Sequence, residues 1–102
     1  MSWQLEFAPE VEEDIAIAAD WYETRQSGLG AQFVEEVIRT WEAVTDNPLL
    51  NCRRHSSKNI RWRYLDRFPY RIIYEVDEMN RVVKVGAVLH AARHDKHWQK
   101  RL

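Results

Sequence analysis

The 102-residue sequence has one cysteine, Cys52, and only three glycines and three prolines. A single cysteine excludes an intramolecular disulfide and fits a reducing compartment. With 45% hydrophobic residues, this composition excludes collagen-like, low-complexity and disordered proteins. No apolar run approaches the about 20 residues of a membrane span, and the first residues lack the pattern of a signal peptide. We therefore expect a soluble, cytoplasmic protein without a membrane partner, folded as a single domain over residues 1–102.

The net charge of −1 hides a strong asymmetry along the chain. Residues 1–50 contain eleven acidic and two basic side chains, whereas residues 51–102 contain five acidic and thirteen basic ones. The basic half is typical of a surface for an anionic partner, such as nucleic acid or an acidic protein segment. The alternative is that the two halves neutralise each other within the fold.

The first half of the sequence predicts a strand followed by two helices. Trp3, Leu5 and Phe7 alternate with polar residues, as in a half-buried strand. Pro9 and the acidic residues after it are typical of a helix N-terminus. The first helix is expected to end by the segment 27–30, where glycines permit a tight turn. A second helix follows up to the segment 46–48, with apolar residues at helical spacing. Together they predict an antiparallel helical hairpin.

The second half predicts a basic connection over 48–59 and then three strands. Apolar residues alternate over 60–64, 70–77 and 82–90, and the links between these segments are short. Short links predict antiparallel neighbours, and the tail over 95–102 adds one helical turn. The expected fold is α+β in the order β-α-α-β-β-β, with the helical hairpin on one face of an antiparallel sheet.

A group of basic residues occupies the alternate positions of these strands. If Ile60, Trp62 and Tyr64 face the helices, the basic residues face the opposite, uncovered side of the sheet. This predicts one cationic surface made of Arg61, Arg63, Arg71, Lys84 and His90, with Arg93 just beyond the last strand.

No cofactor or metal is expected from the motifs. A phosphate-binding loop motif is absent, and Gly28-Leu29-Gly30 fits a turn between helices. His90, His94 and His97 have a spacing that a helix could bring near one metal ion, but Asp95 is the one further ligand type nearby. Solvent-exposed residues at the end of the chain explain this run better than a metal site.

Several stretches of the sequence match a known family in order and spacing, nearly from end to end. They are Phe7-Ala8-Pro9 with Asp14-Ile15, Trp21-Tyr22, Gly28-Leu29-Gly30 with Phe33, Asn47-Pro48, Arg61 with Leu65, Phe68-Pro69-Tyr70-Arg71-Ile72-Ile73-Tyr74, and Val88-Leu89-His90 with Arg93 and Trp98. The sequence thereby resembles the RelE/ParE superfamily of bacterial type II toxin–antitoxin systems, in the ParE-like or plasmid stabilisation protein branch. The resemblance implies the same β-α-α-β-β-β fold and a growth-inhibiting protein that a cognate antitoxin neutralises.

The resemblance leaves the cellular target open. RelE-like members cut mRNA in the ribosome, whereas ParE-like members block DNA gyrase without cutting nucleic acid. RNA cleavage needs a proton acceptor, a proton donor and cations for the developing charge. Here His90 or His94 would transfer protons, and Arg61, Arg63 and Arg93 would stabilise charge. His94 stands where the nuclease branch commonly has tyrosine, which weakens a tyrosine-based mechanism.

Three interpretations follow. We favour a non-enzymatic toxin that binds DNA gyrase through the cationic surface; the second is an mRNA endonuclease, and the third is a non-toxic interaction module of the same fold. Ile17 and Trp21, one helical turn apart, form a stripe displaced from the core face of the first helix. This pair is expected to receive an antitoxin helix or a second copy of the chain, unless the helix simply buries a wide stripe.

Overall fold

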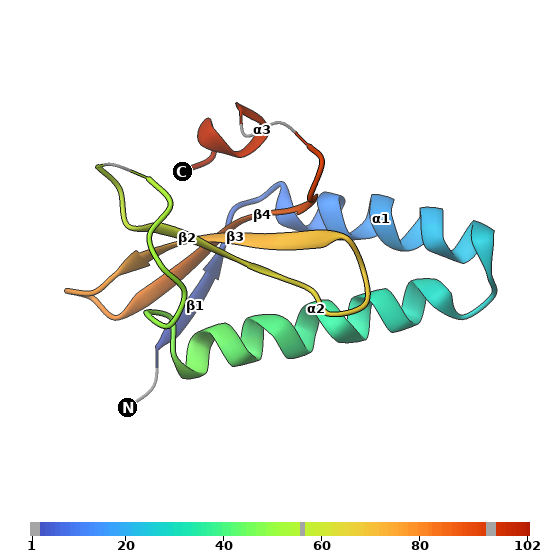
Figure 1. The fold of residues 1–102 in the computed structure, drawn as a ribbon, viewed down its shortest axis with the longest axis horizontal. Helices are drawn as coiled ribbons and strands as arrows, with labels where there is room; N and C mark the ends of the chain where they lie inside the picture. Colours follow the sequence, from blue (N-terminus) through green and yellow to red (C-terminus); the bar gives the residue numbers. More distant parts are fainter. Residues whose placement is uncertain (1–2, 56, 94–95) are drawn as a thin grey trace.

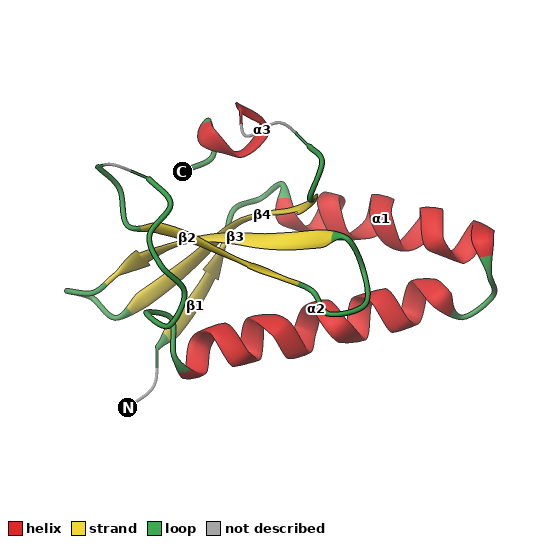
Figure 2. Cartoon of the chain, in the orientation of Figure 1, coloured by secondary structure: helices red, strands yellow, loops and turns green. Residues whose placement is uncertain are grey.

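The computed structural model describes residues 3–55, 57–93 and 96–102, which form four strands and three helices. In chain order they are β1 (Gln4–Phe7), α1 (Val11–Arg25), α2 (Leu29–Asp46), β2 (Ile60–Tyr64), β3 (Tyr70–Asp77), β4 (Val82–His90) and α3 (Lys96–Gln99) (Figure 1). The helical hairpin α1–α2 lies along one side of the sheet, and α3 lies on the other (Figure 2). The predicted α+β order is confirmed, including the short helical turn near the end of the chain.

The four strands form one sheet in the order β1-β4-β3-β2. β2, β3 and β4 are antiparallel neighbours, as their short connections predict. β1 instead runs parallel to β4, from Gln4 opposite Val82 to Phe7 opposite Val85. The sheet is therefore mixed rather than antiparallel throughout. Both long helices and two strands lie between β1 and β4 in the chain, so no hairpin constrains this pair to be antiparallel.

The turn between α1 and α2 depends on two glycines. Gly28 has a φ of 88°, a left-handed conformation that favours glycine. The Glu23 carboxylate accepts hydrogen bonds from the backbone N–H groups of Gly28 and Gly30. A Cβ at Gly30 would lie 2.6 Å from the carbonyl oxygen of Ala19, so the helices approach closely there. The predicted helix–helix turn is confirmed.

Within the described ranges, no helix combines the length and the apolar composition that crossing a bilayer requires.

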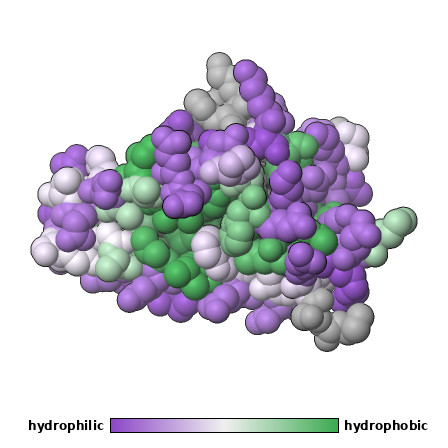
Figure 3. Space-filling model, turned by 180° about the vertical axis from the view of Figure 1, so that it is seen from behind, coloured by the Kyte–Doolittle hydropathy of each residue, from purple (hydrophilic) through white to green (hydrophobic). Residues whose placement is uncertain are grey.

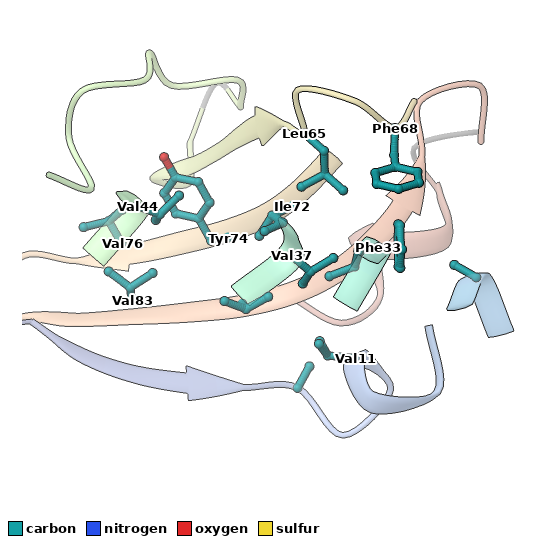
Figure 4. Packing of buried hydrophobic residues seen from close by; sticks show 14 residues of the cluster. Val11, Phe33, Val37, Val44, Leu65, Phe68, Ile72, Tyr74, Val76 and Val83 are labelled. Carbon is teal, nitrogen blue, oxygen red and sulfur yellow. The ribbon is translucent and has the colours of Figure 1, made fainter. Parts of the chain in front are cut away.

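The main core lies between the helical hairpin and the sheet (Figure 4). α2 has the clearest apolar stripe, and its Phe33, Val37 and Val44 are fully buried. They pack over strand residues that include Ile72 and Tyr74 of β3. Burying side chains of this size contributes about 1.5–3 kcal/mol each, so this interface dominates the stability of the fold.

The opposite face of the sheet is also covered, contrary to expectation. A second apolar cluster contains Trp98 and Leu102 of the C-terminal segment, packed on Ile73 and Leu89. Trp62, expected in the core under the helices, pairs with Ile73 and lies on this second face, 6.2 Å from Trp98 between ring centroids. The alternation over 60–64 fits either face, because β3 is apolar on both sides. The C-terminal segment therefore supplies a layer that the sequence pattern did not predict.

Candidate functional site

The predicted cationic surface is divided between the two faces of the sheet. Residues directly opposite each other in an antiparallel pair share a face. Arg61 and Arg63 lie opposite Tyr74 and Ile72, and His90 lies opposite Tyr70, all on the helix side. Arg71 lies opposite Leu89 and Lys84 opposite Glu75, on the second face.

An irregularity in β4 is one reason for this division. The β3–β4 register shifts between Ile73 and Tyr74, because these residues lie opposite Ala87 and Val85, respectively. Gly86 is therefore the extra residue of a β-bulge, which reverses the alternation beyond it. A Cβ at Gly86 would lie 2.6 Å from the Leu102 side chain. The prediction that five basic residues gather on one uncovered face is wrong.

Arg61 is buried and holds the basic connection before β2 in place. Its relative exposure is 9%, and its guanidinium donates hydrogen bonds to the carbonyls of Leu49 and Asn51 and to Asn59 Oδ1. Tyr74 anchors the same segment, since its hydroxyl accepts a hydrogen bond from Asn51 Nδ2. Burial raises the pKa of Tyr74, so its phenol stays protonated. Arg61 is thus a structural residue whose Nε and Nη1 donors are already used.

Arg71 and Lys84 have separate environments on the second face. Arg71 is 4% exposed; its guanidinium lies 4.6 Å above the Trp62 ring and donates to the carbonyl oxygen of Arg93 over 3.3 Å. Lys84 lines a polar hollow of about 360 Å³ with four carboxylates, those of Glu6, Glu75, Asp77 and Glu78. Neither residue belongs to an exposed cationic patch.

Arg63 is half-buried beside α2, where it lines a polar hollow of about 240 Å³. Arg39, Glu36 and Asp66 line the same hollow, so it contains two basic and two acidic side chains. Glu36 is buried and accepts hydrogen bonds from the backbone N–H and the Nε of Arg67. Burial alone raises the pKa of Glu36, but the hydrogen bonds from Arg67 outweigh it and lower the pKa below its usual value. This charge-balanced region differs from the anion-binding surface that the sequence suggested.

The remaining candidates, His90 and Arg93, lie near Ile17 and Trp21 in two adjoining hollows. The larger one, which we call the Trp21 groove, has a volume of about 430 Å³ and is lined by Ile17, Ala18, Trp21, Tyr22, Pro69, Tyr70 and His90. A smaller hollow of about 90 Å³ shares Ile17, Ala18, Tyr70 and His90 with it and extends to Asp14 and Arg93. Ile17 and Trp21 were predicted as an association surface and His90 and Arg93 as a target surface. The structure brings the two pairs together.

A hydrogen bond to His90 determines which ring nitrogen carries the proton in the neutral ring. The backbone N–H of Ala92 donates to His90 Nδ1 over 3.0 Å. In the neutral ring the proton is then on Nε2, which acts as a hydrogen-bond donor. The ring also makes an edge contact with Tyr70, with centroids 5.3 Å apart. Burial raises the pKa of Tyr70, an effect that the charge of Arg93 opposes in part, so Tyr70 is a neutral phenol at pH 7.

The carboxylate that lines the smaller hollow, Asp14, is already paired. Asp14 accepts from Arg101 Nη1 over 2.6 Å and from Arg101 Nη2 over 3.2 Å, and from the backbone N–H of Val88 over 3.1 Å. Arg101 also donates to the carbonyl oxygen of Gly86. β1 ends opposite Val85, so this ion pair satisfies the β4 edge where no strand continues. Asp14 therefore links α1, β4 and the C-terminal segment.

No metal centre is found where the structure describes the chain: its His, Cys, Asp and Glu side chains form no group able to hold an ion. His94 and Asp95 lie outside the described residues, as does the side chain of His97. The roles of His94 as a proton-transfer group and of this histidine run therefore stay predictions.

The sequence analysis missed Tyr22 and Tyr70 as groove residues. Both have periodicity that assigns them to the core, and Tyr22 does pack on Phe33 and Phe68. Burial raises the pKa of Tyr22, and Tyr70 acts in the same direction. Tyr70 lies in the Phe68–Tyr74 stretch that resembles the toxin family. Such a resemblance arises from residues of the fold as well as from residues of a site, so it did not identify Tyr70 as a groove residue.

A second apolar hollow, of about 390 Å³, lies on the other side of the buried face of α1. It is lined by residues that include Phe7, Pro9, Ile15 and Trp41, and the rings of Phe7 and Trp41 are 4.9 Å apart. Seen from behind, the surface has hydrophobic residues gathered near its middle and hydrophilic ones around them (Figure 3). Phe7 of β1 is 44% exposed and lines this second hollow. Apolar surface therefore lies on both flanks of α1, at this hollow and at the Trp21 groove.

A family model described as the ParE toxin of the type II toxin–antitoxin system, parDE, matches residues 5–95. No curated protein sequence matches the chain.

Solved toxin structures have the same fold at low sequence identity. A chain of the chromosomal ParDE system of P. aeruginosa is 14% identical, with a TM-score of 0.70 over 86% of this chain and 95% of that chain. The isolated E. coli RelE toxin is 20% identical, with a TM-score of 0.67 over 93% and 90% of the two chains. A chain of the intact E. coli RelBE toxin–antitoxin complex is 20% identical, with a TM-score of 0.66 over 89% and 99%.

Proposed function

Because the chain belongs to the ParE toxin family of type II toxin–antitoxin systems, we propose that it stops bacterial growth by binding DNA gyrase and does not cut RNA. The observation that supports binding over cleavage is the division of the predicted cations. RNA cleavage requires a proton acceptor, a proton donor and cations around one phosphate. Arg61 is buried in the loop before β2, and Arg71 lies on the other face of the sheet. Of the predicted cations, His90 lines the Trp21 groove and Arg93 lines the smaller hollow beside it.

The protonation of the groove residues also favours binding. His90 presents an Nε2–H donor, because Nδ1 accepts from Ala92, and a nitrogen that already carries a proton is no general base. Tyr70 is a neutral phenol, and both oxygens of Asp14 are held by Arg101. The described groove residues therefore offer donors and apolar surface, which suit recognition of another protein.

A second candidate function is that of a ribosome-dependent mRNA endonuclease. It is favoured by the meeting of His90, Tyr70 and Arg93 in one hollow, together with the structural similarity to E. coli RelE. In this alternative, His90 or His94 transfers protons and Arg93 stabilises charge on the phosphate.

The partner that we propose is a cognate antitoxin. The solved structures similar to this chain include toxin–antitoxin complexes such as E. coli RelBE. Ile17 and Trp21 are 63% and 50% exposed, and they would be covered on binding. We propose that the antitoxin contacts this pair and thereby covers the adjacent His90 and Arg93.

Two variants at His90 distinguish the candidate functions. The chain and its variants are induced without antitoxin in a bacterial host, and growth, DNA supercoiling and mRNA integrity are followed together. His90→Gln keeps an N–H donor but cannot transfer a proton at pH 7, so binding predicts that growth arrest persists with loss of supercoiling. His90→Ala removes the donor and is expected to weaken arrest. Fragmented mRNA in the wild type, with arrest abolished by His90→Gln, would overturn the proposal in favour of the endonuclease.

A further inference from the structure

The second apolar hollow, where β1, α1 and α2 meet, takes no part in the function proposed for the chain. We call it the Phe7–Trp41 hollow. Its volume of about 390 Å³ is in the range of pockets that hold small ligands. Its apolar wall includes Phe7, Pro9, Ile15 and Trp41. Among the described residues that line it, Glu12 alone carries a charge.

Phe7 and Trp41 form an aromatic pair in this wall. Their ring centroids are 4.9 Å apart, and the ring planes are inclined at 61° in an edge contact. Both rings are partly open to solvent, Phe7 by 44%. An aromatic ring attracts a cation to its face, and sets of such rings bind alkylammonium groups in proteins. The pair is therefore a suitable wall for a positively charged ligand.

No cation of the chain occupies this aromatic pair. Arginine guanidinium groups lie over the rings of three other tryptophans, in the pairs Arg81–Trp3, Arg25–Trp21 and Arg54–Trp62. In the part of the chain that the structure describes, no basic side chain lies over Phe7 or Trp41 in this way, and none lines the hollow. A cation bound here would therefore come from a ligand.

Carboxylates at the start of α1 give the hollow a negative potential. The Glu12 side chain lines it and has no hydrogen-bond or ion-pair partner among the described residues. Glu10 and Glu13 lie beside Glu12 at this end of the helix, whereas Asp14 is neutralised by Arg101. A helix N-terminus carries about half a positive charge, which three carboxylates outweigh. The field at the hollow thus favours a cation and disfavours an anion.

We infer that the Phe7–Trp41 hollow binds a small organic cation of the alkylammonium class. The ammonium group lies against the faces of Phe7 and Trp41, beside the Glu12 carboxylate, and the apolar part of the ligand packs on Ile15. A nucleic-acid strand would bring phosphates against Glu12, and a second copy docked by the same face would bring the same carboxylates, so both are disfavoured. The inference goes beyond the proposed function and does not depend on it.

The test uses the purified full chain and two ligands of the same shape, choline and its uncharged analogue 3,3-dimethyl-1-butanol. Affinities are measured by NMR titration at constant ionic strength, with the indole N–H signal of Trp41 as the reporter. The two ligands differ in charge at one atom, so their comparison separates cation binding from burial of apolar surface. We expect choline to bind at least about fivefold more tightly than the analogue.

Two matched pairs of variants locate the site. Glu12→Gln, at an exposed residue, is expected to weaken choline about threefold. Glu13→Gln makes the same change in the same helical turn but outside the hollow, so its effect should be smaller. Phe7→Leu keeps the wall apolar and should remove most of the preference for choline over the analogue. Trp21→Leu removes a half-exposed ring elsewhere and should leave that preference unchanged.

Other results would overturn the inference. One is equal affinity for choline and 3,3-dimethyl-1-butanol, and another is the absence of detectable choline binding. Equal weakening by Glu12→Gln and Glu13→Gln would mean that choline responds only to the general charge of α1. Equal effects of Phe7→Leu and Trp21→Leu would place the bound cation outside the hollow. Because growth arrest is not measured, failure here and failure of the gyrase proposal are separate outcomes.

Discussion

Arg61 and Arg93 are both basic residues that the sequence assigned to one surface, yet their environments differ completely. Arg61 is 9% exposed, and its Nε and Nη1 groups donate to an asparagine and to two backbone carbonyls. Arg93 is exposed and lines the smaller hollow beside the Trp21 groove. The basic half of the sequence thus contains arginines that stabilise the fold and others that are available to a partner. Only the second kind supports an argument about function.

The same comparison extends to Arg101 and Arg71. Arg101 joins the C-terminal segment to α1 through Asp14, and Arg71 stacks on Trp62 under that segment. Much of the positive charge of the second half is therefore used inside the molecule. The predictions below test the difference between these structural arginines and the groove residues, in order of decreasing effect on the free energy of unfolding.

Arg61→Ala is expected to have the largest effect. It leaves the carbonyls of Leu49 and Asn51 without a donor in a partly buried site, so the free energy of unfolding should fall by about 3 kcal/mol. Urea denaturation measures this loss. Arg53→Ala, an exposed arginine of the same loop, is the control and should change stability by less than about 0.5 kcal/mol. Similar losses for both variants would contradict a structural role for Arg61.

Arg101→Ala is expected to lower the free energy of unfolding by about 2 kcal/mol, because it removes a bidentate ion pair with Asp14. A double-mutant cycle with Asp14→Asn isolates the pair, and we expect a coupling of about 1 kcal/mol. Strict additivity of the two substitutions would mean that the ion pair does not link α1 to the C-terminal segment.

Glu36→Gln is expected to change the acid sensitivity of the fold. Burial alone raises the pKa of Glu36, but hydrogen bonds from Arg67 lower it below its usual value overall. A depressed pKa in the folded state contributes stability above the unfolded pKa, and that stability is lost as the pH falls through the folded value. Between about pH 5 and pH 2.5 the wild type should therefore lose about 1 kcal/mol more than Glu36→Gln. Urea titrations at several pH values measure this, and parallel acid profiles would refute it.

Trp21→Ala is expected to have the smallest effect on stability, below about 1 kcal/mol, because the ring is half-exposed. In the same variant the affinity for the cognate antitoxin should fall at least about fivefold. Met79→Ala, a fully exposed apolar residue between β3 and β4, is the matched control. Trp21 would belong to the core, and not to a docking surface, if stability fell strongly while antitoxin affinity did not.

The order of elements could be predicted because each has a clear local signal. The apolar spacing of α2, with Phe33 and Val37 on one face, and the glycines of the helix turn have one reasonable interpretation. The short links between β2, β3 and β4 determine that these strands are antiparallel. These signals depend only on neighbouring residues, so a single sequence was sufficient.

The faces of the sheet could not be predicted, for a physical reason. Ile72 and Ile73 are adjacent in β3 and both fully buried, so alternation does not distinguish the helix side from the second face. The bulge at Gly86 and the packing of Trp98 depend on contacts between distant parts of the chain. The sequence therefore identified Ile17, Trp21, His90 and Arg93 as candidates but could not show that they line two adjoining hollows.

The most direct test of this account is the growth arrest caused by Arg93→Glu beside that of the wild type, with thermal unfolding of both purified chains. The account predicts a wild-type Tm for Arg93→Glu and a strong loss of growth arrest, because Arg93 serves a partner and not the fold. Wild-type arrest by a fully folded Arg93→Glu chain would contradict it and would place the target-binding surface elsewhere.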